Sequence, residues 1–147
     1  MTDATLERRM LVSLRIALSP FPENNRELQF TVVDKAGTPL DATVNVGKEF
    51  EQLHDMVSGI AAKTLAPPRE TPFGQPQQPR VMIGFDGAKA PNYRFHFTIV
   101  YAAGDGSPLP PTTYIAPVSE ASLARLADAL RTVAEAGSGV AEWTAAG

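Results

Sequence analysis

The sequence contains no cysteine among its 147 residues, and this absence excludes several kinds of chemistry at once. Without thiols the chain has no disulfide, no zinc–thiolate site and no cysteine nucleophile. A chain without disulfides suits a reducing compartment. Arg15 also interrupts the apolar run near the N-terminus, which is unlike a signal peptide. We therefore expect a cytoplasmic protein.

Histidine is almost as scarce, because the chain has only His54 and His96, 42 positions apart. No closely spaced ligand set accompanies either one, so we expect no metal and no cofactor. The sequence has no Gly-x-Ser-x-Gly motif, and prolines follow Gly104-Asp-Gly106 where a phosphate-binding loop would begin a helix. The acids Glu49 and Asp55 suit the start and the solvated face of a helix. The sequence predicts no catalytic residues.

Long apolar runs and basic clusters are also missing. No run of about 18 apolar residues is present, so no membrane-spanning segment is predicted. The 13 Lys and Arg residues are scattered among 16 acids and the net charge is −3, which argues against a nucleic-acid partner. A chain that is 44% hydrophobic and 20% charged is globular in composition. We expect a single domain over residues 1–137 and a loosely ordered tail at 138–147.

The clearest pattern that is present lies between residues 93 and 101. Tyr, Phe, Phe, Ile and Tyr alternate with Arg94, His96, Thr98 and a valine, which predicts a strand with an aromatic face on the core. The other face presents Arg94, His96 and Thr98 as candidate binding residues. Acid–base catalysis by His96 is not favoured, because no orienting carboxylate is encoded nearby. A polar sheet surface is the preferred interpretation.

Other segments give further elements. Strands are predicted at 26–33 and 40–46, forming a hairpin around Gly37, and at 80–85, pairing with the strand from residue 93. A short edge strand is predicted at 112–116. Helices are predicted at 47–66, with Gly59 marking a close packing contact, and at 119–136, capped by Ser119 and closed by Gly137.

Three segments are ambiguous. Residues 4–18 fit either a helix or a strand, and their Leu, Met, Ala and Glu content favours the helix. The segment Pro67–Pro79 holds five prolines and is either a stiff spacer or a docking arm that carries Phe73. Trp143 lies in the tail, and we expect it to dock onto the domain or onto a partner.

These elements predict an α+β fold, with two to three helices packed on an antiparallel sheet of two hairpins and about four to six strands. In this layout, over most of residues 4–136, the chain resembles the YezG-like immunity proteins of polymorphic toxins and the chaperones of type III secretion. The helix expected before Pro20, the strand pairs and the helix at 50–65 carry the resemblance. It implies that the chain binds another protein, a toxin or a secreted effector, without catalysis.

The sequence therefore predicts a non-enzymatic protein-binding protein, foremost an immunity protein that neutralises a bacterial toxin. A chaperone-like adaptor is the alternative within this class. A small-ligand or enzymatic domain that uses the sheet face around His96 is the alternative outside it. The candidate binding residues are Arg94, His96, Thr98, Phe73 and Trp143, and a homodimer remains open.

Overall fold

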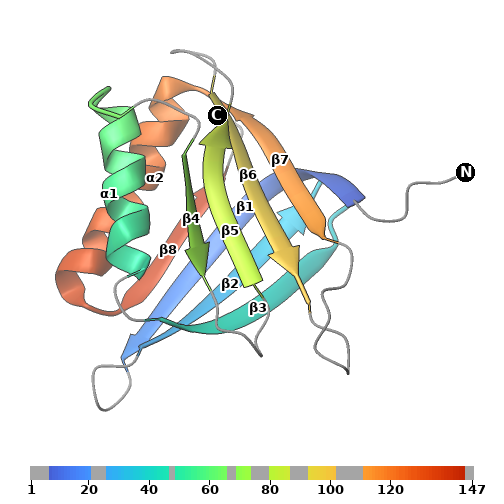
Figure 1. Ribbon diagram of the computed structural model, residues 1–147, viewed down its shortest axis with the longest axis horizontal. Helices are drawn as coiled ribbons and strands as arrows, with labels where there is room; N and C mark the ends of the chain where they lie inside the picture. Colours follow the sequence, from blue (N-terminus) through green and yellow to red (C-terminus); the bar gives the residue numbers. More distant parts are fainter. Residues whose placement is uncertain are drawn as a thin grey trace, which may run out of the picture.

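The computed structural model describes residues 7–20, 26–46, 49–65, 69–73, 80–86, 93–101 and 111–144. These residues form an α+β fold with a mostly antiparallel sheet, as predicted, but with more strands than expected and with two helices (Figure 1). The elements are β1 (Glu7–Pro20), β2 (Arg26–Asp34), β3 (Pro39–Val46), α1 (Glu49–Ala61), β4 (Arg69–Phe73), β5 (Arg80–Asp86), β6 (Tyr93–Val100), β7 (Thr112–Val118), α2 (Glu120–Ala136) and β8 (Gly139–Thr144).

The strand order is β3-β2-β1-β7-β6-β5-β4, and β8 also pairs with β1. The long strand β1 belongs to two parts of the sheet. Its first residues pair in parallel with β7, and residues 13–18 pair with β8. We call strands β4, β5, β6 and β7 the β4–β7 half. Strands β2, β3 and β8 form the β2–β3–β8 half. The ring centroid of Phe30 on β2 lies 5.3 Å from that of Phe73 on β4 and 5.5 Å from that of Phe97 on β6. The inner faces of the two halves therefore pack on each other.

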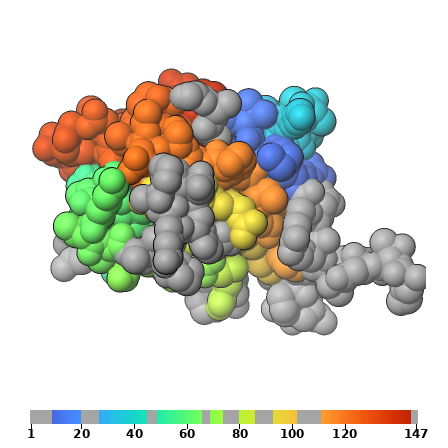
Figure 2. Space-filling view, turned by 90° about the horizontal axis from the view of Figure 1, so that it is seen from above, coloured from blue at the N-terminus to red at the C-terminus, as the bar shows by residue number. Residues whose placement is uncertain are grey.

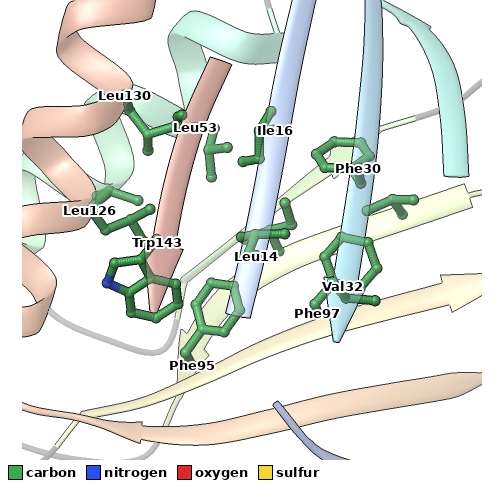
Figure 3. Packing of buried hydrophobic residues seen from close by; sticks show 14 of the residues in the cluster. Leu14, Ile16, Phe30, Val32, Leu53, Phe95, Phe97, Leu126, Leu130 and Trp143 are labelled. Carbon is green, nitrogen blue, oxygen red and sulfur yellow. The ribbon is translucent and has the colours of Figure 1, made fainter. Parts of the chain in front are cut away.

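The core lies between these inner faces and the two helices. Figure 2 shows α1 and α2 together at one end of the molecule, with the start of β1 away from them. Helix α1 packs against β4 and helix α2 against β8. The inner face of β6 is buried as predicted, whereas Tyr101 lies beyond the end of the strand and is exposed. Figure 3 shows Leu126 and Leu130 of α2 and Leu53 of α1 directed at this core.

Both helices confirm the predicted ones, with a shorter α1. The Ser119 side chain accepts a hydrogen bond from Ser122 N, and Gly137 takes a φ of 77° at the C-terminal end of α2. Helix α1 ends at Ala61, before the prolines expected to stop it, because Lys63 adopts a left-handed φ of 65°. The chain then folds back, and Leu65 packs over Gly59. A Cβ on Gly59 would lie 2.5 Å from Leu65 Cδ1, which confirms the predicted close contact.

The helix expected at residues 4–18 is wrong, because residues from Glu7 onward form β1. A register shift between Leu11 and Ser13 inserts Val12 as an extra residue opposite β2. The buried residues are therefore Leu11, Leu14, Ile16 and Leu18, with one step of three before the steps of two. That single step of three imitates the spacing of a helix.

The proline-rich segment contains a strand that the sequence analysis did not predict. Residues 69–73 form β4, which pairs with β5 at one edge of the sheet. Pro72 fits there because an edge strand can leave a backbone position without a donor. Phe73 is buried at 3% exposure and packs on Phe30, so it is not a docking side chain. The Gly104-Asp-Gly106 segment, at which the sequence predicts no phosphate-binding loop, lies outside the described residues.

The C-terminal segment also differs from the loose tail that was expected. Residues 139–144 form β8, which runs antiparallel to β1. Trp143 is 4% exposed and stacks edge-on against Phe95 at 5.0 Å (Figure 3). Its Nε1 donates to Ser122 O at 2.9 Å and lies 3.1 Å from Ser122 Oγ. The tryptophan docks onto its own domain, the first of the two expectations for this residue.

The β2–β3 turn is fastened by Asp34. Its Oδ1 accepts a hydrogen bond from Thr38 N at 3.0 Å, and its Oδ2 lies 3.3 Å from Nη1 of Arg9 on β1. Gly37 supplies the positive φ of 84° that this turn needs. The hydrogen bond from Thr38, helped by the Arg9 guanidinium, lowers the pKa of the Asp34 carboxyl.

Candidate functional site

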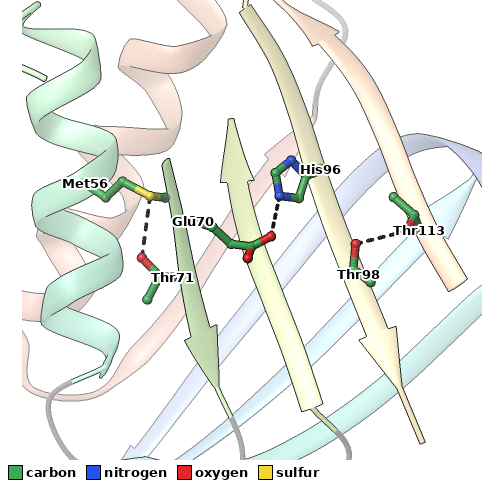
Figure 4. A network of polar contacts seen from close by, with 6 residues as sticks. All are labelled: Met56, Glu70, Thr71, His96, Thr98 and Thr113. Atoms are coloured by element: carbon green, nitrogen blue, oxygen red, sulfur yellow. Dashed lines mark hydrogen bonds and ion pairs between the residues drawn. The ribbon is translucent and has the colours of Figure 1, made fainter. Parts of the chain in front are cut away.

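A histidine–carboxylate contact between two non-adjacent strands marks the outer face of the β4–β7 half. His96 Nε2 on β6 lies 2.9 Å from Glu70 Oε2 on β4 (Figure 4). Strand β5 runs between them, and Gly84 occupies the intervening position in register with both. The two side chains therefore meet over a strand that presents no side chain at that point.

Gly84 is the residue that makes this contact sterically feasible. A Cβ at this position would lie 2.2 Å from Arg69 O, and 2.9 Å from both Glu70 Cα and His96 Cε1. Two of these three atoms belong to the backbone, so a side chain here would have to move β4 itself. Glycine inside a strand often marks such a close approach. The imidazole of His96 thus fills space that a larger residue on β5 would occupy.

The pair corrects the expectation that no carboxylate accompanies His96. Glu70 is 26 positions away in the sequence, and it approaches only because β4 forms the edge of the sheet beside β5. The one sequence feature that indicates this contact is Gly84, a glycine inside an otherwise apolar strand. Gly84 alone does not identify Glu70 as the partner of His96, because the sequence does not predict strand β4.

The geometry of His96 fits a fixed surface group better than an acid–base catalyst. Nε2 is directed at Glu70, Nδ1 is buried, and the side chain is only 14% exposed. A general base has to reach the proton that it removes, directly or through one water molecule. Here the exposed end of the pair is the Glu70 carboxylate, whose side chain is 46% exposed. The arrangement holds a charge in a defined place on the sheet.

Neighbouring residues extend this face across five strands. In register, Glu70, Gly84 and His96 continue to Ile115 on β7 and Met10 on β1. We call this set the cross-strand row. Met10 is exposed, and so is Val12 beyond it on the same strand. The row therefore joins a charged end to an apolar end.

Thr98 and Arg94 flank the cross-strand row on the same face of β6. Thr98 Oγ1 lies 3.0 Å from Thr113 Oγ1 on β7, which fixes both hydroxyl groups (Figure 4). Arg94 is exposed and lies in register with Pro117. Three of the five predicted binding residues thus share one surface, whereas Phe73 and Trp143 lie in the core.

The remaining polar candidates do not add a metal centre or a membrane segment. Across the ranges that the structure describes, no three His, Asp or Glu side chains gather as a metal site. His54 is partly buried on α1, with Nδ1 3.4 Å from Oδ1 of its neighbour Asp55. Within the same ranges, neither helix has the length and apolar character needed to cross a membrane.

Comparison with known proteins adds no relative to this description. No family model matches the chain, and neither the curated proteins nor the solved structures contain a match.

Proposed function

We propose that this chain is a non-enzymatic protein-binding protein, and within that class a cytoplasmic immunity protein that neutralises a bacterial toxin by direct binding. The cross-strand row is the observation that carries the proposal. It presents Glu70, held by His96, together with exposed Met10 on one sheet face. Protein interfaces are enriched in methionine, an adaptable apolar side chain, and carry polar groups at their rim, so the two ends of this row together suit an interface.

The rigidity of the face supports binding over catalysis. Association is weakened when flexible side chains must become ordered at the interface. The His96–Glu70 pair, across β5, and the Thr98–Thr113 contact, between β6 and β7, already hold four side chains in place. The chain's net charge of −3 suits a basic partner, since opposite net charges speed encounter.

Co-expression with the product of the neighbouring gene tests the function. We expect a complex with one-to-one stoichiometry, and we expect this chain to rescue cells that express the neighbouring product. The function is wrong if neither the complex nor the rescue occurs. A dimer of this chain that binds only an extended N-terminal segment of the partner would instead indicate a chaperone-like adaptor.

A further inference from the structure

A groove of about 420 Å³ lies between α1 and β4, next to the His96–Glu70 pair. Asp55 and Met56 line it from the helix, and residues 69–71 line it from the strand. Gln52 of the helix and Leu65, in the segment that folds back over Gly59, complete the lining. Figure 4 shows Met56 and Thr71 facing each other between α1 and β4. The groove is therefore built by the unexpected strand β4 and by the early end of α1.

The walls of this groove differ in polarity. Met56 and Leu65 provide apolar surface, and Met56 is almost fully buried. Two carboxylates stand at the groove, Asp55 with a side chain that is 80% exposed and Glu70 at 46%. Arg69 is also a lining residue, so the formal charges of these three residues sum to −1. A ligand with an apolar stem and a cationic head would match both kinds of wall.

Thr71 supplies an independent polar contact point. Its residue is only 4% exposed, yet its hydroxyl donates to Met56 Sδ at 3.5 Å. A thioether is a weak acceptor, and the threonine oxygen can itself accept from a further donor. A ligand that donates a hydrogen bond to the Thr71 oxygen would therefore stabilise this poorly satisfied hydroxyl when it enters the groove.

We infer that the groove receives an arginine side chain of the partner protein, with its stem on Met56 and Leu65 and its guanidinium between Asp55 and Glu70. Arginine fits because its planar fork offers five donors to carboxylate and hydroxyl acceptors. His96 acts here as a positioning residue, because it holds Oε2 of Glu70 and thereby orients the carboxylate at the groove. The inference rests on the proposed function, since it names how a protein partner is anchored.

The chemistry of the groove can be tested without the partner. N-acetyl-arginine methylamide is titrated into the isotope-labelled protein and followed by amide chemical shifts. We expect saturable shifts at residues 55–56 and 69–71, and none from the citrulline analogue, which has nearly the same shape but no charge. Absence of saturable shifts there, or equal shifts from both compounds, would overturn the inference.

Charge variants sharpen this titration. Asp55→Asn and Glu70→Gln should each weaken arginine binding about twofold to fivefold, as expected for solvent-exposed ion pairs. Arg69→Gln should strengthen it by removing a like charge. The matched control is Asp128→Asn, an exposed acid on α2 that pairs with Arg131 within its own helix. An equal loss from Asp128→Asn would show that only net charge matters and would contradict a groove site.

The same variants separate the groove from the proposed function. If the one-to-one complex forms, Asp55→Asn combined with Glu70→Gln should weaken it at least tenfold, whereas Asp128→Asn should leave it unchanged. An unchanged complex in the double variant removes the groove from the interface while the binding function stands. If neither a complex with the neighbouring product nor a rescue from it occurs, the function fails irrespective of the arginine titration.

Discussion

The two halves of the sheet present outer faces of different kinds. On the β2–β3–β8 side, a polar row of residues in register on four strands consists of Glu142, Arg15, Thr31 and Asp41. Each strand in it contributes a polar side chain, three of the four are exposed, and Thr31 Oγ1 donates to Asp41 Oδ1 at 2.7 Å. This is the usual solvated face of an antiparallel sheet.

The cross-strand row on the β4–β7 side departs from that pattern, because Gly84, Ile115 and Met10 carry no polar side chain. Gly84 leaves its strand without a side chain, so His96 and Glu70 meet over it and the imidazole becomes largely buried. Met10 ends the row as an exposed apolar residue. Gly84 therefore allows a side-chain contact across an intervening strand, whereas the Thr31–Asp41 contact of the other face joins adjacent strands.

The largest expected effect is on the free energy of unfolding, when an inner and an outer side chain of β8 are truncated in turn. Trp143→Ala should lower the free energy of unfolding by about 3–5 kcal/mol, because it removes a buried aromatic residue from the core. Val140→Ala, on the exposed side of the same strand, should change it by less than about 0.5 kcal/mol. Urea denaturation measures both. Similar losses would mean that β8 is not part of the core.

A methyl group at Gly84 tests what makes the two outer faces differ. Gly84→Ala should destabilise the fold by about 1–3 kcal/mol, because the added carbon collides with the β4 backbone. Thr31→Ala in the polar row of the other half has no such collision and should cost less than about 0.5 kcal/mol. A neutral or stabilising Gly84→Ala, as expected for an unconstrained glycine in a strand, would contradict the account.

Double-mutant cycles compare the two polar pairs directly. His96→Ala and Glu70→Gln should show a coupling energy of about 0.5–1 kcal/mol, limited because the Glu70 side chain is nearly half exposed. Thr31→Val and Asp41→Ala on the solvated face should couple by less than about 0.5 kcal/mol, because water replaces this exposed hydrogen bond when either partner is removed. Equal coupling energies from chemical denaturation would mean that the glycine gives the His96–Glu70 pair no added rigidity.

The smallest expected effect is on the stability at acid pH. It depends on Asp34, which joins the β2–β3 turn to β1. The folded state lowers the pKa of Asp34 below its ordinary value of 3.8, so folding favours its ionised form. Its contribution is complete above that ordinary value and is lost as the pH falls through the lowered pKa. Asp34→Asn should therefore flatten the fall in stability at acid pH in melts recorded from pH 5 to pH 2. An unchanged slope would assign the acid sensitivity to other groups.

Regular patterns explain what the sequence could predict. Strand β6 and helix α2 each keep one period over their whole length, and α2 is closed by Ser119 and Gly137. Strand β1 was misassigned because the bulge at Val12 changes its period within a single strand. A bulge depends on pairing with β2, so the local sequence does not reveal it.

The candidate site was predictable only in part, for a related reason. The alternation along β6 placed Arg94, His96 and Thr98 on one outer face. Glu70 belongs to a five-residue edge strand among prolines, which has too few side chains to show a period. Phe73 and Trp143 were assigned to binding because their segments lacked regular patterns, yet pairing with β5 and β1 draws both into the core.

The central claim is that the outer face of the β4–β7 half binds the partner. Met10 and Val140 provide a matched test, because Met10 in the cross-strand row is 45% exposed and Val140 on the β2–β3–β8 half is 44% exposed. The dissociation constant of the one-to-one complex should be measured for Met10→Glu and Val140→Glu. We predict at least tenfold weaker binding for Met10→Glu and less than a twofold change for Val140→Glu. Equal effects, or a larger effect from Val140→Glu, would contradict the claim.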